Sequence, residues 1–376
     1  MTRLRVRSVL LGLAAPALAL LLALVVATVV VVVSGSSPFD AVDAVARSAG
    51  LARIQTATVN TAITYYLSAV AVAVGFRMNL FNIGVDGQYR VAAMLAAAAG
   101  AAWALPPVVH QVVIIAVAVA AGAAWSGIAA LLKVTRGVSE VISTIMLNAI
   151  ATALVAWLIL PAQFGLRTKG SNDLTTTPIG TSGRVPSFPP IPGPGSSQGI
   201  YGLILLAAVV GLGYWFLLGF TRFGFDLRAT GSSASAAVAS GVSVRRMVVV
   251  SMLISGGVAG LVGLPVLLGS SYSYGLDFPT GIGFTGIAVA LLGRNHPVGM
   301  VFGALLWSFL ERTSNGLQAV GISTEIVTIV QGVIVISVVV AYELVRRYKL
   351  VLQQREVGKV AATIPGAAVQ QAEAGA

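Results

Sequence analysis

Acidic side chains are the groups in this sequence with the greatest capacity for chemistry, and their placement is informative. The 376 residues include twelve Asp and Glu, nearly all of which lie between apolar runs or at the ends of runs. Glu140 is expected to open one helix and Glu311 to end another. Only Asp86 lies within an apolar segment that glycines interrupt, and Arg90 follows it four residues later. On a helix this spacing places both side chains on one face, where they can pair.

Several kinds of catalytic and metal site are excluded by residue type. The sequence has no cysteine and only two histidines, His110 and His296, which rules out disulfides, thiolate chemistry and a multi-histidine metal site. It also lacks the G-x-x-x-x-G-K-[ST] phosphate loop, the G-x-S-x-G elbow and the H-E-x-x-H pair. We therefore predict no catalytic residue, no metal and no cofactor, and a protein that is not an enzyme.

The composition predicts a membrane protein. Hydrophobic residues make up 57% of the chain and charged residues only 9%, whereas soluble domains carry about 25% charged residues. The formal net charge of +11 does not indicate nucleic acid, because the cations do not form a stripe interleaved with aromatic residues. They lie mostly between apolar runs, as expected for positive charge on the inner side of a membrane.

Ten apolar runs position these groups. Each long run is apolar all round, which is typical of helices buried in lipid or in one another, and the 42 glycines allow close helix approach. We predict an all-α polytopic membrane protein with about ten transmembrane helices. The runs cover residues 9–33, 56–76, 84–105, 108–132, 140–160, 200–220, 246–269, 281–293, 297–312 and 324–344.

The cations also predict the orientation of the chain. With a cytoplasmic N-terminus, most Lys and Arg near the runs fall on the inner side, and the exceptions lie in longer loops where the bias is weaker. Both chain ends are then cytoplasmic. This topology gives a transmembrane domain over 1–349, with an inner loop at 222–246 and a Pro-rich outer loop at 161–199. Residues 350–376 are expected to form a disordered cytoplasmic tail.

Two local patterns suggest a function for the domain. NIGVDGQ (82–88) resembles GIGFTGI (281–287), which predicts an inverted repeat with glycine-broken helices, as found at transporter sites; chance similarity in a glycine-rich protein is the alternative. In the inner loop, Gly231 and Gly241 bracket a small-residue segment that predicts a short helix capped by Ser232 or Ser233. Such a helix would let another protein approach closely, although an ordinary basic loop is also consistent.

Four separated segments of the chain are recognisable. They are FNIGVDGQ (81–88), VISTIMLNAIA (141–151), LRATGSSASAAVASGVSVRRM (227–247) and FTGIAVALLGRNHPVGMVFGALL (284–306). Together they resemble the membrane subunits of bacterial ABC importers, in the family that contains permeases for branched-chain amino acids, simple sugars and nucleosides. The similarity extends over about residues 55–345. It is strongest to nucleoside and simple-sugar permeases, although Asp86 stands where Glu is commoner.

The resemblance implies a multi-pass permease of the bacterial cytoplasmic membrane. Its expected partners are a second permease subunit, identical or paralogous, two ATP-binding cassette subunits and an extracytoplasmic solute-binding protein, with membrane lipid around it and no nucleic acid. The expected contacts with the ATPase are Arg228, Gly231, Ala236, Ala237 and Gly241. The candidates to face the solute pathway are Asn82, Asp86, Gln88, Asn148 and Phe284.

Alternatives remain at the level of sites and of function. Asn82 and Gln88 could bind solute hydroxyls, or they could satisfy backbone groups freed where a helix breaks. The sequence shows no series of buried acids that would exploit an ion gradient, so the leading hypothesis is a permease driven by a separate ATPase. A branched-chain amino-acid permease, a stand-alone secondary transporter or channel, and an intramembrane enzyme using Asp86 stay open.

Overall fold

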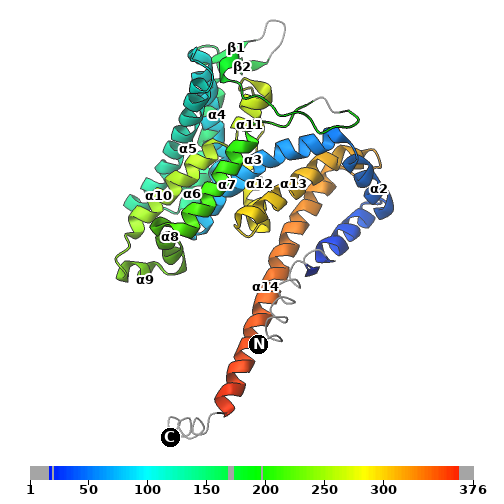
Figure 1. Cartoon of the computed structure of the whole chain (residues 1–376), viewed down its shortest axis with the longest axis vertical. Helices are drawn as coiled ribbons and strands as arrows, with labels where there is room; N and C mark the ends of the chain where they lie inside the picture. The colour runs from blue at the N-terminus through cyan, green and yellow to red at the C-terminus, as the bar shows by residue number, and fades with distance from the viewer. Residues whose placement is uncertain (1–16, 19–20, 168–172, 196–197, 364–376) are drawn as a thin grey trace. The chain divides into compact units, whose positions relative to one another are not determined.

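The computed structural model describes residues 17–18, 21–167, 173–195 and 198–363, and these residues are almost entirely helical (Figure 1). They form two compact units: one is Asp43–Leu317, and the other combines the described parts of Met1–Val42 and Gln318–Ala376. Each of the ten predicted apolar runs is mainly helical in its described part. The all-α membrane fold expected from the sequence is therefore confirmed.

The larger unit contains most of the helices. Beyond α2 (Pro38–Ala49), which crosses its N-terminal boundary, it contains long apolar helices together with several short ones. Its elements are α3 (Ala52–Phe76), α4 (Val85–Ala102), α5 (Val109–Arg136), α6 (Glu140–Leu158), α7 (Ile204–Phe220), α8 (Arg222–Ser232), α9 (Ala234–Ala239), α10 (Val244–Gly260), α11 (Leu264–Val266), η2 (Leu267–Ser271), α12 (Ile282–Leu292) and α13 (Pro297–Gln318).

Five of the described helical segments are long and apolar enough to cross a membrane. They are α3, α5, α6, Val244–Ser271 and Thr324–Tyr348, and two bent helix pairs raise the number to seven. Ten crossings are therefore not established. The shortfall has a physical reason, since α12 has 11 residues and covers only about 17 Å at 1.5 Å per residue.

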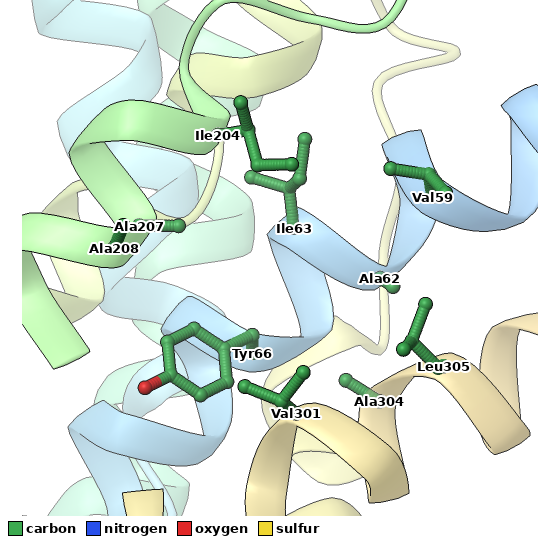
Figure 2. A pocket seen from close by; sticks show the side chains of 10 residues that line it. All are labelled: Val59, Ala62, Ile63, Tyr66, Ile204, Ala207, Ala208, Val301, Ala304 and Leu305. Carbon is green, nitrogen blue, oxygen red and sulfur yellow. The ribbon is translucent and has the colours of Figure 1, made fainter. Parts of the chain in front are cut away.

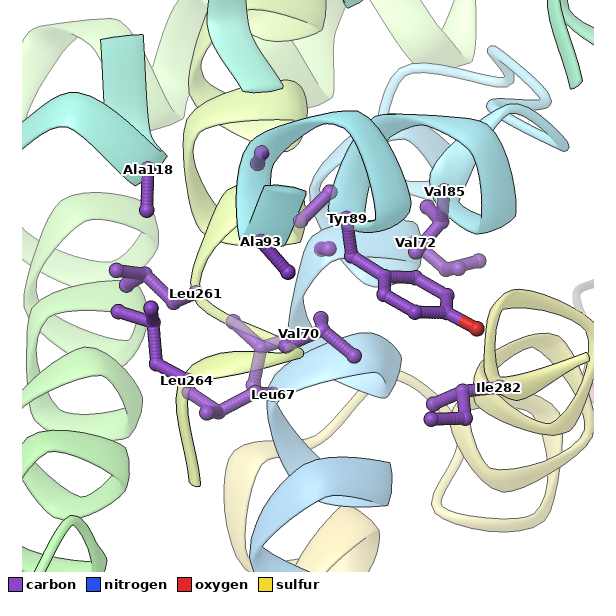
Figure 3. Close-up of a cluster of buried hydrophobic side chains, with 14 of the residues drawn as sticks. Leu67, Val70, Val72, Val85, Tyr89, Ala93, Ala118, Leu261, Leu264 and Ile282 are labelled. Atoms are coloured by element: carbon purple, nitrogen blue, oxygen red, sulfur yellow. The ribbon is translucent and has the colours of Figure 1, made fainter. Parts of the chain in front are cut away.

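The core of the larger unit surrounds α3. Its side chains pack between α10, α12 and α7, while α4 packs against α5 and α6. Figure 3 shows Leu67 and Val70 of α3 facing Ala93 of α4 and Leu264 after α10, all of them buried. Helix α9 and a small β-hairpin lie at opposite ends of this unit (Figure 1).

A small hairpin marks one of these ends. Strands β1 (Gly165–Arg167) and β2 (Leu174–Thr176) pair antiparallel within the Pro-rich segment predicted as the outer loop, and η1 (Thr181–Gly183) follows. We call this end of the Asp43–Leu317 unit the hairpin end, and the opposite end the α9 end. The short strands are consistent with a segment whose prolines disfavour helix and longer strands.

Local sequence signals place the helix ends. α5 ends at Gly137, whose φ of +69° is left-handed, and the Gly137 amide donates to the Lys133 carbonyl, as glycine C-caps do. Glu140 begins α6, as predicted, and its carboxylate pairs with Lys133 Nζ at 2.5 Å. That ion pair fastens the turn between two neighbouring helices.

The last two helices differ from their predicted bounds. Glu311 does not end its helix, because α13 continues to Gln318; the predicted run stopped where Arg312 interrupts the apolar pattern. α14 (Thr324–Thr363) extends through part of the segment expected to be a tail, and residues 364–376 lie outside the described residues. The disordered character of the tail stays a prediction.

Candidate functional site

The start of α4 is held by a buried network of amide side chains. The side chains of Asn82 and Gln88 are each 1% exposed. Asn82 Oδ1 accepts hydrogen bonds from the Gly84 amide at 3.1 Å and from Gln88 Nε2 at 2.9 Å. Asn82 Nδ2 donates to Ser255 Oγ of α10 at 2.8 Å. Backbone groups freed at a helix break in an apolar bundle need such partners, so this network explains how the chain turns into α4.

Asp86 lies where the two similar sequence segments meet. The Gly283 amide, in the first turn of α12, donates to Asp86 Oδ1 at 3.3 Å. A Cβ on Gly283 would lie 2.4 Å from the Asp86 nitrogen, so only glycine permits this approach. Tyr89 adds a second link, because its hydroxyl donates to the Pro279 carbonyl at 2.7 Å. The first turns of α4 and α12 are therefore in direct contact.

Asn148 joins α6 to the same junction. Its Oδ1 accepts from the Gly87 amide at 2.8 Å, and its Nδ2 donates to the Ile83 carbonyl at 2.9 Å. Arg90 turns to α6 as well, where Nη1 donates to Thr152 Oγ1 at 2.8 Å. The structure thus brings together Asn82, Asp86, Gln88 and Asn148 around the first turns of α4.

Phe284 is the fifth candidate and has a different environment. It directly follows Gly283 in α12, but its side chain is 54% exposed. Of the five residues predicted to face the solute pathway, Phe284 is the one that projects from the surface. Asn82 and Gln88 are the most deeply buried, and their polar atoms are already bonded to protein groups.

Replacing Asn148 by leucine tests the importance of the junction. The change leaves the Gly87 amide without its acceptor, and a buried donor without a partner costs roughly 1–3 kcal/mol. We expect the melting temperature of the detergent-purified protein to fall by several degrees in a thermal unfolding assay. Asn315→Leu, on an exposed position of α13, is the control and should leave it unchanged; equal melting of the two variants would contradict the inference.

The α9 end carries the small-residue helix expected in the inner loop. Ser233 caps α9 by accepting from the Ala236 amide at 3.3 Å, which confirms one of the two predicted caps. After the helix, Gly241 has a φ of +84°, and a Cβ added to it would meet no atom within 4 Å. Helix α8 meets α7 at a bend of 73°, so the α8–α9 segment turns out of the bundle direction.

The predicted coupling residues fall into outward-facing and inward-facing sets. Ala236 is exposed, as is its neighbour Val238, at 61%. Ala237 is buried, at 2%. Gly231 packs inward, since a Cβ there would lie 2.5 Å from the Arg77 carbonyl oxygen. Arg228 is exposed along α8 and donates to the Leu218 carbonyl.

Two cavities lie beside α3, and they differ in chemistry. The first, of about 370 Å³, lies between α3, α7 and α13, and Tyr66 supplies the only polar side chain among its ten lining residues (Figure 2). The second, of about 380 Å³, is lined by polar groups that include Tyr65, Glu311 and Arg312. Sequence reasoning missed this polar cavity; the signal was the Glu311–Arg312 pair inside a helix taken to end there.

The apolar helical bundle and the exposed small-residue helix α9 are consistent with a membrane permease. Residues 55–339 match the family described as branched-chain amino acid transport system, permease component. The chain belongs to this family, and the resemblance seen in the sequence is confirmed. It is a multi-pass permease subunit of the ABC transporter type and not an enzyme.

Three curated relatives refine the comparison. The chain is 37% identical to the guanosine ABC transporter permease protein NupP of Bacillus subtilis, over 76% of this chain and 80% of the relative. It is 28% identical to the glucose ABC transporter permease protein TsgB13 of Haloferax volcanii, over 89% of each chain. It is 29% identical to the nucleoside ABC transporter permease protein NupB of Lactococcus lactis, over 87% and 90%. No solved structure matches the chain.

Proposed function

We propose that this chain forms the solute pathway of an ABC importer for nucleosides or simple sugars. The observation that carries the proposal is the 37% identity to a guanosine permease over 76% of the chain. Relatives named for glucose and for nucleosides cover the chain at similar lengths, which favours a solute with a sugar ring over a branched-chain amino acid.

The proposal also includes an inverted repeat and assigns residues to the solute pathway. The paired segments at 82–88 and 281–287 form an inverted repeat within about ten crossings, and their meeting point lines the translocation route. Asp86 and Phe284 contact the solute there, while Asn82, Gln88 and Asn148 hold the broken helix in place. The hydrogen bonds between Asp86 and Gly283 and between Asn148 and Gly87 support this division of roles.

The proposed assembly comprises two permease subunits, two ATPase subunits and one extracytoplasmic binding protein. The α9 end faces the cytoplasm with both chain termini, and the hairpin end faces the binding protein. Arg228, Gly231, Ala236, Ala237 and Gly241 shape the surface that the ATPase contacts. The short length of α9 and the exposure of Ala236 and Val238 suit a helix that inserts into a groove on another protein.

An uptake assay with the reconstituted complex tests the function. We expect proteoliposomes holding this chain, its partner permease, the ATPases and the binding protein to accumulate labelled guanosine or glucose only with internal ATP. Leucine is the matched control solute, and its accumulation instead would favour a branched-chain amino-acid permease. Solute accumulation by this chain alone under an ion gradient would overturn the proposal in favour of a secondary transporter.

A further inference from the structure

The polar cavity beside α3 borders the segment that precedes α7, through Gln198 and Tyr201. Its walls come from the first half of α3, the second half of α13, and the segments 198–201 and 279–282. The volume of about 380 Å³ is within the range of small-molecule sites. The residues that determine its chemistry are Asn60, Thr61, Tyr65, Tyr201, Glu311 and Arg312.

Glu311 gives the cavity an incompletely satisfied carboxylate. The hydroxyl of Tyr65, itself only 7% exposed, donates to Glu311 Oε2. A carboxylate offers about four acceptor positions, and none of the ion pairs found among the described residues includes Glu311. Charged groups within apolar helices are costly and mark functional sites. The remaining acceptor positions are therefore available to a ligand.

Arg312 supplies donors beside this carboxylate. Its Nε and Nη2 both donate to Thr61 Oγ1 of α3, at 2.9 and 2.5 Å, which fixes one edge of the guanidinium. The group has five N–H donors in a planar fork, so part of the fork remains for a ligand oxygen. Adjacent acceptors and donors in one cavity suit a neutral solute that carries several hydroxyl groups.

Hydrogen bonds join the segment 198–201 of the cavity wall to α3. Asn60 Oδ1 accepts from the Tyr201 amide at 2.8 Å, and Asn60 Nδ2 donates to the Gly199 carbonyl at 3.0 Å. On the other side, Pro279 and Thr280 border the cavity, and the Pro279 carbonyl accepts from Tyr89 of α4. The wall segment that contains Pro279 is thereby hydrogen-bonded to α4, one turn after Asp86.

We propose that this cavity is a binding subsite for the sugar ring of the transported solute. Glu311, oriented by Tyr65, accepts hydrogen bonds from two adjacent ring hydroxyls, and Arg312 donates to a ring or hydroxyl oxygen. Glucose and the ribose of a nucleoside both carry a pair of adjacent ring hydroxyls, so one cavity serves either cargo. This inference rests on the proposed function and assigns it a specific site.

Transport of solutes with and without the hydroxyl pair tests the subsite. In the reconstituted importer, Glu311→Gln should lower kcat/KM for guanosine roughly tenfold, because bonds to a charged acceptor are lost. It should leave 2′,3′-dideoxyguanosine nearly unaffected. If the importer carries glucose, glucose and 3-deoxyglucose form the corresponding pair. An equal fall for both members of a pair would overturn the subsite, as would no fall for either.

Two further variants separate a positioning role from a general loss of structure. Tyr65→Phe removes only the hydroxyl that orients Glu311, so it should reduce the same discrimination to a smaller extent. Asp43→Asn removes a carboxylate that is 62% exposed and pairs with Arg47, and it should preserve discrimination. A wild-type importer that carries neither guanosine nor glucose would contradict the proposed function itself, which distinguishes that failure from failure of the subsite.

Site-directed labelling gives a test that does not depend on the Glu311 variant folding. Because the sequence has no cysteine, Thr280→Cys introduces a single thiol at the cavity. Guanosine or glucose should slow its reaction with a water-soluble maleimide severalfold. Leu276→Cys, 61% exposed and outside the lining residues, should react equally with and without solute. Equal labelling of Thr280→Cys in both conditions would overturn the inference.

Discussion

Val238→Asp is expected to abolish ATP-driven uptake while the protein still inserts and folds. Val238 is 61% exposed on α9, so the change costs the isolated chain little. In the assembled importer the same position would lie against the ATPase, where an unpaired buried charge costs several kcal/mol. The ATPase should then co-purify with the variant at least roughly 100-fold more weakly, and guanosine or glucose uptake should fall to background.

The control for this prediction is chosen by exposure. Leu276→Asp introduces the same charge at a residue that is also 61% exposed, but near the hairpin end. It should leave ATPase co-purification unchanged. Full co-purification of Val238→Asp with the ATPase would show that α9 is not the docking element. Gly231→Trp is less selective, because Gly231 already packs against Arg77 and the fold would change with the interface.

The sequence predicted the helices better than it predicted the number of membrane crossings. Every apolar run became helix, and the serine cap of α9 followed from Ser233 as expected. The number of crossings did not follow, because helix length and not apolar character decides whether a segment spans, and α12 is only 11 residues long. Apolar composition alone does not reveal where a helix bends or breaks.

The candidate sites were predictable to different degrees. Glycines beside Asn82 and Asp86 identified the broken start of α4, since their spacing is local in the chain. The partners of these residues were not predictable: Ser255 and Gly283 come from helices more than a hundred residues away. Glu311 was missed for the same reason, because its significance depends on Tyr65 of a distant helix.

Helices α5 and α10 approach so closely that glycine is required at three positions, Gly122, Gly256 and Gly260. A Cβ on Gly122 of α5 would lie 2.3 Å from the Gly256 carbonyl oxygen, and one on Gly260 of α10 would lie 2.0 Å from the Ala118 oxygen. Gly256 and Gly260 are four residues apart and so share one helix face. Small residues at this spacing are what allow membrane helices to pack backbone to backbone.

Gly122→Leu should therefore prevent correct packing of the bundle. The new side chain meets backbone atoms that cannot move independently, so we expect a loss of about 3 kcal/mol or more and little monodisperse protein on gel filtration in detergent. Gly213→Leu provides the matched control, because a Cβ on Gly213 of α7 meets nothing within 4 Å, and this variant should purify like the wild type. Normal yield and melting temperature for Gly122→Leu would mean that α5 and α10 are farther apart than described. The packing of the core that positions α4 and Asp86 would then also differ from this description.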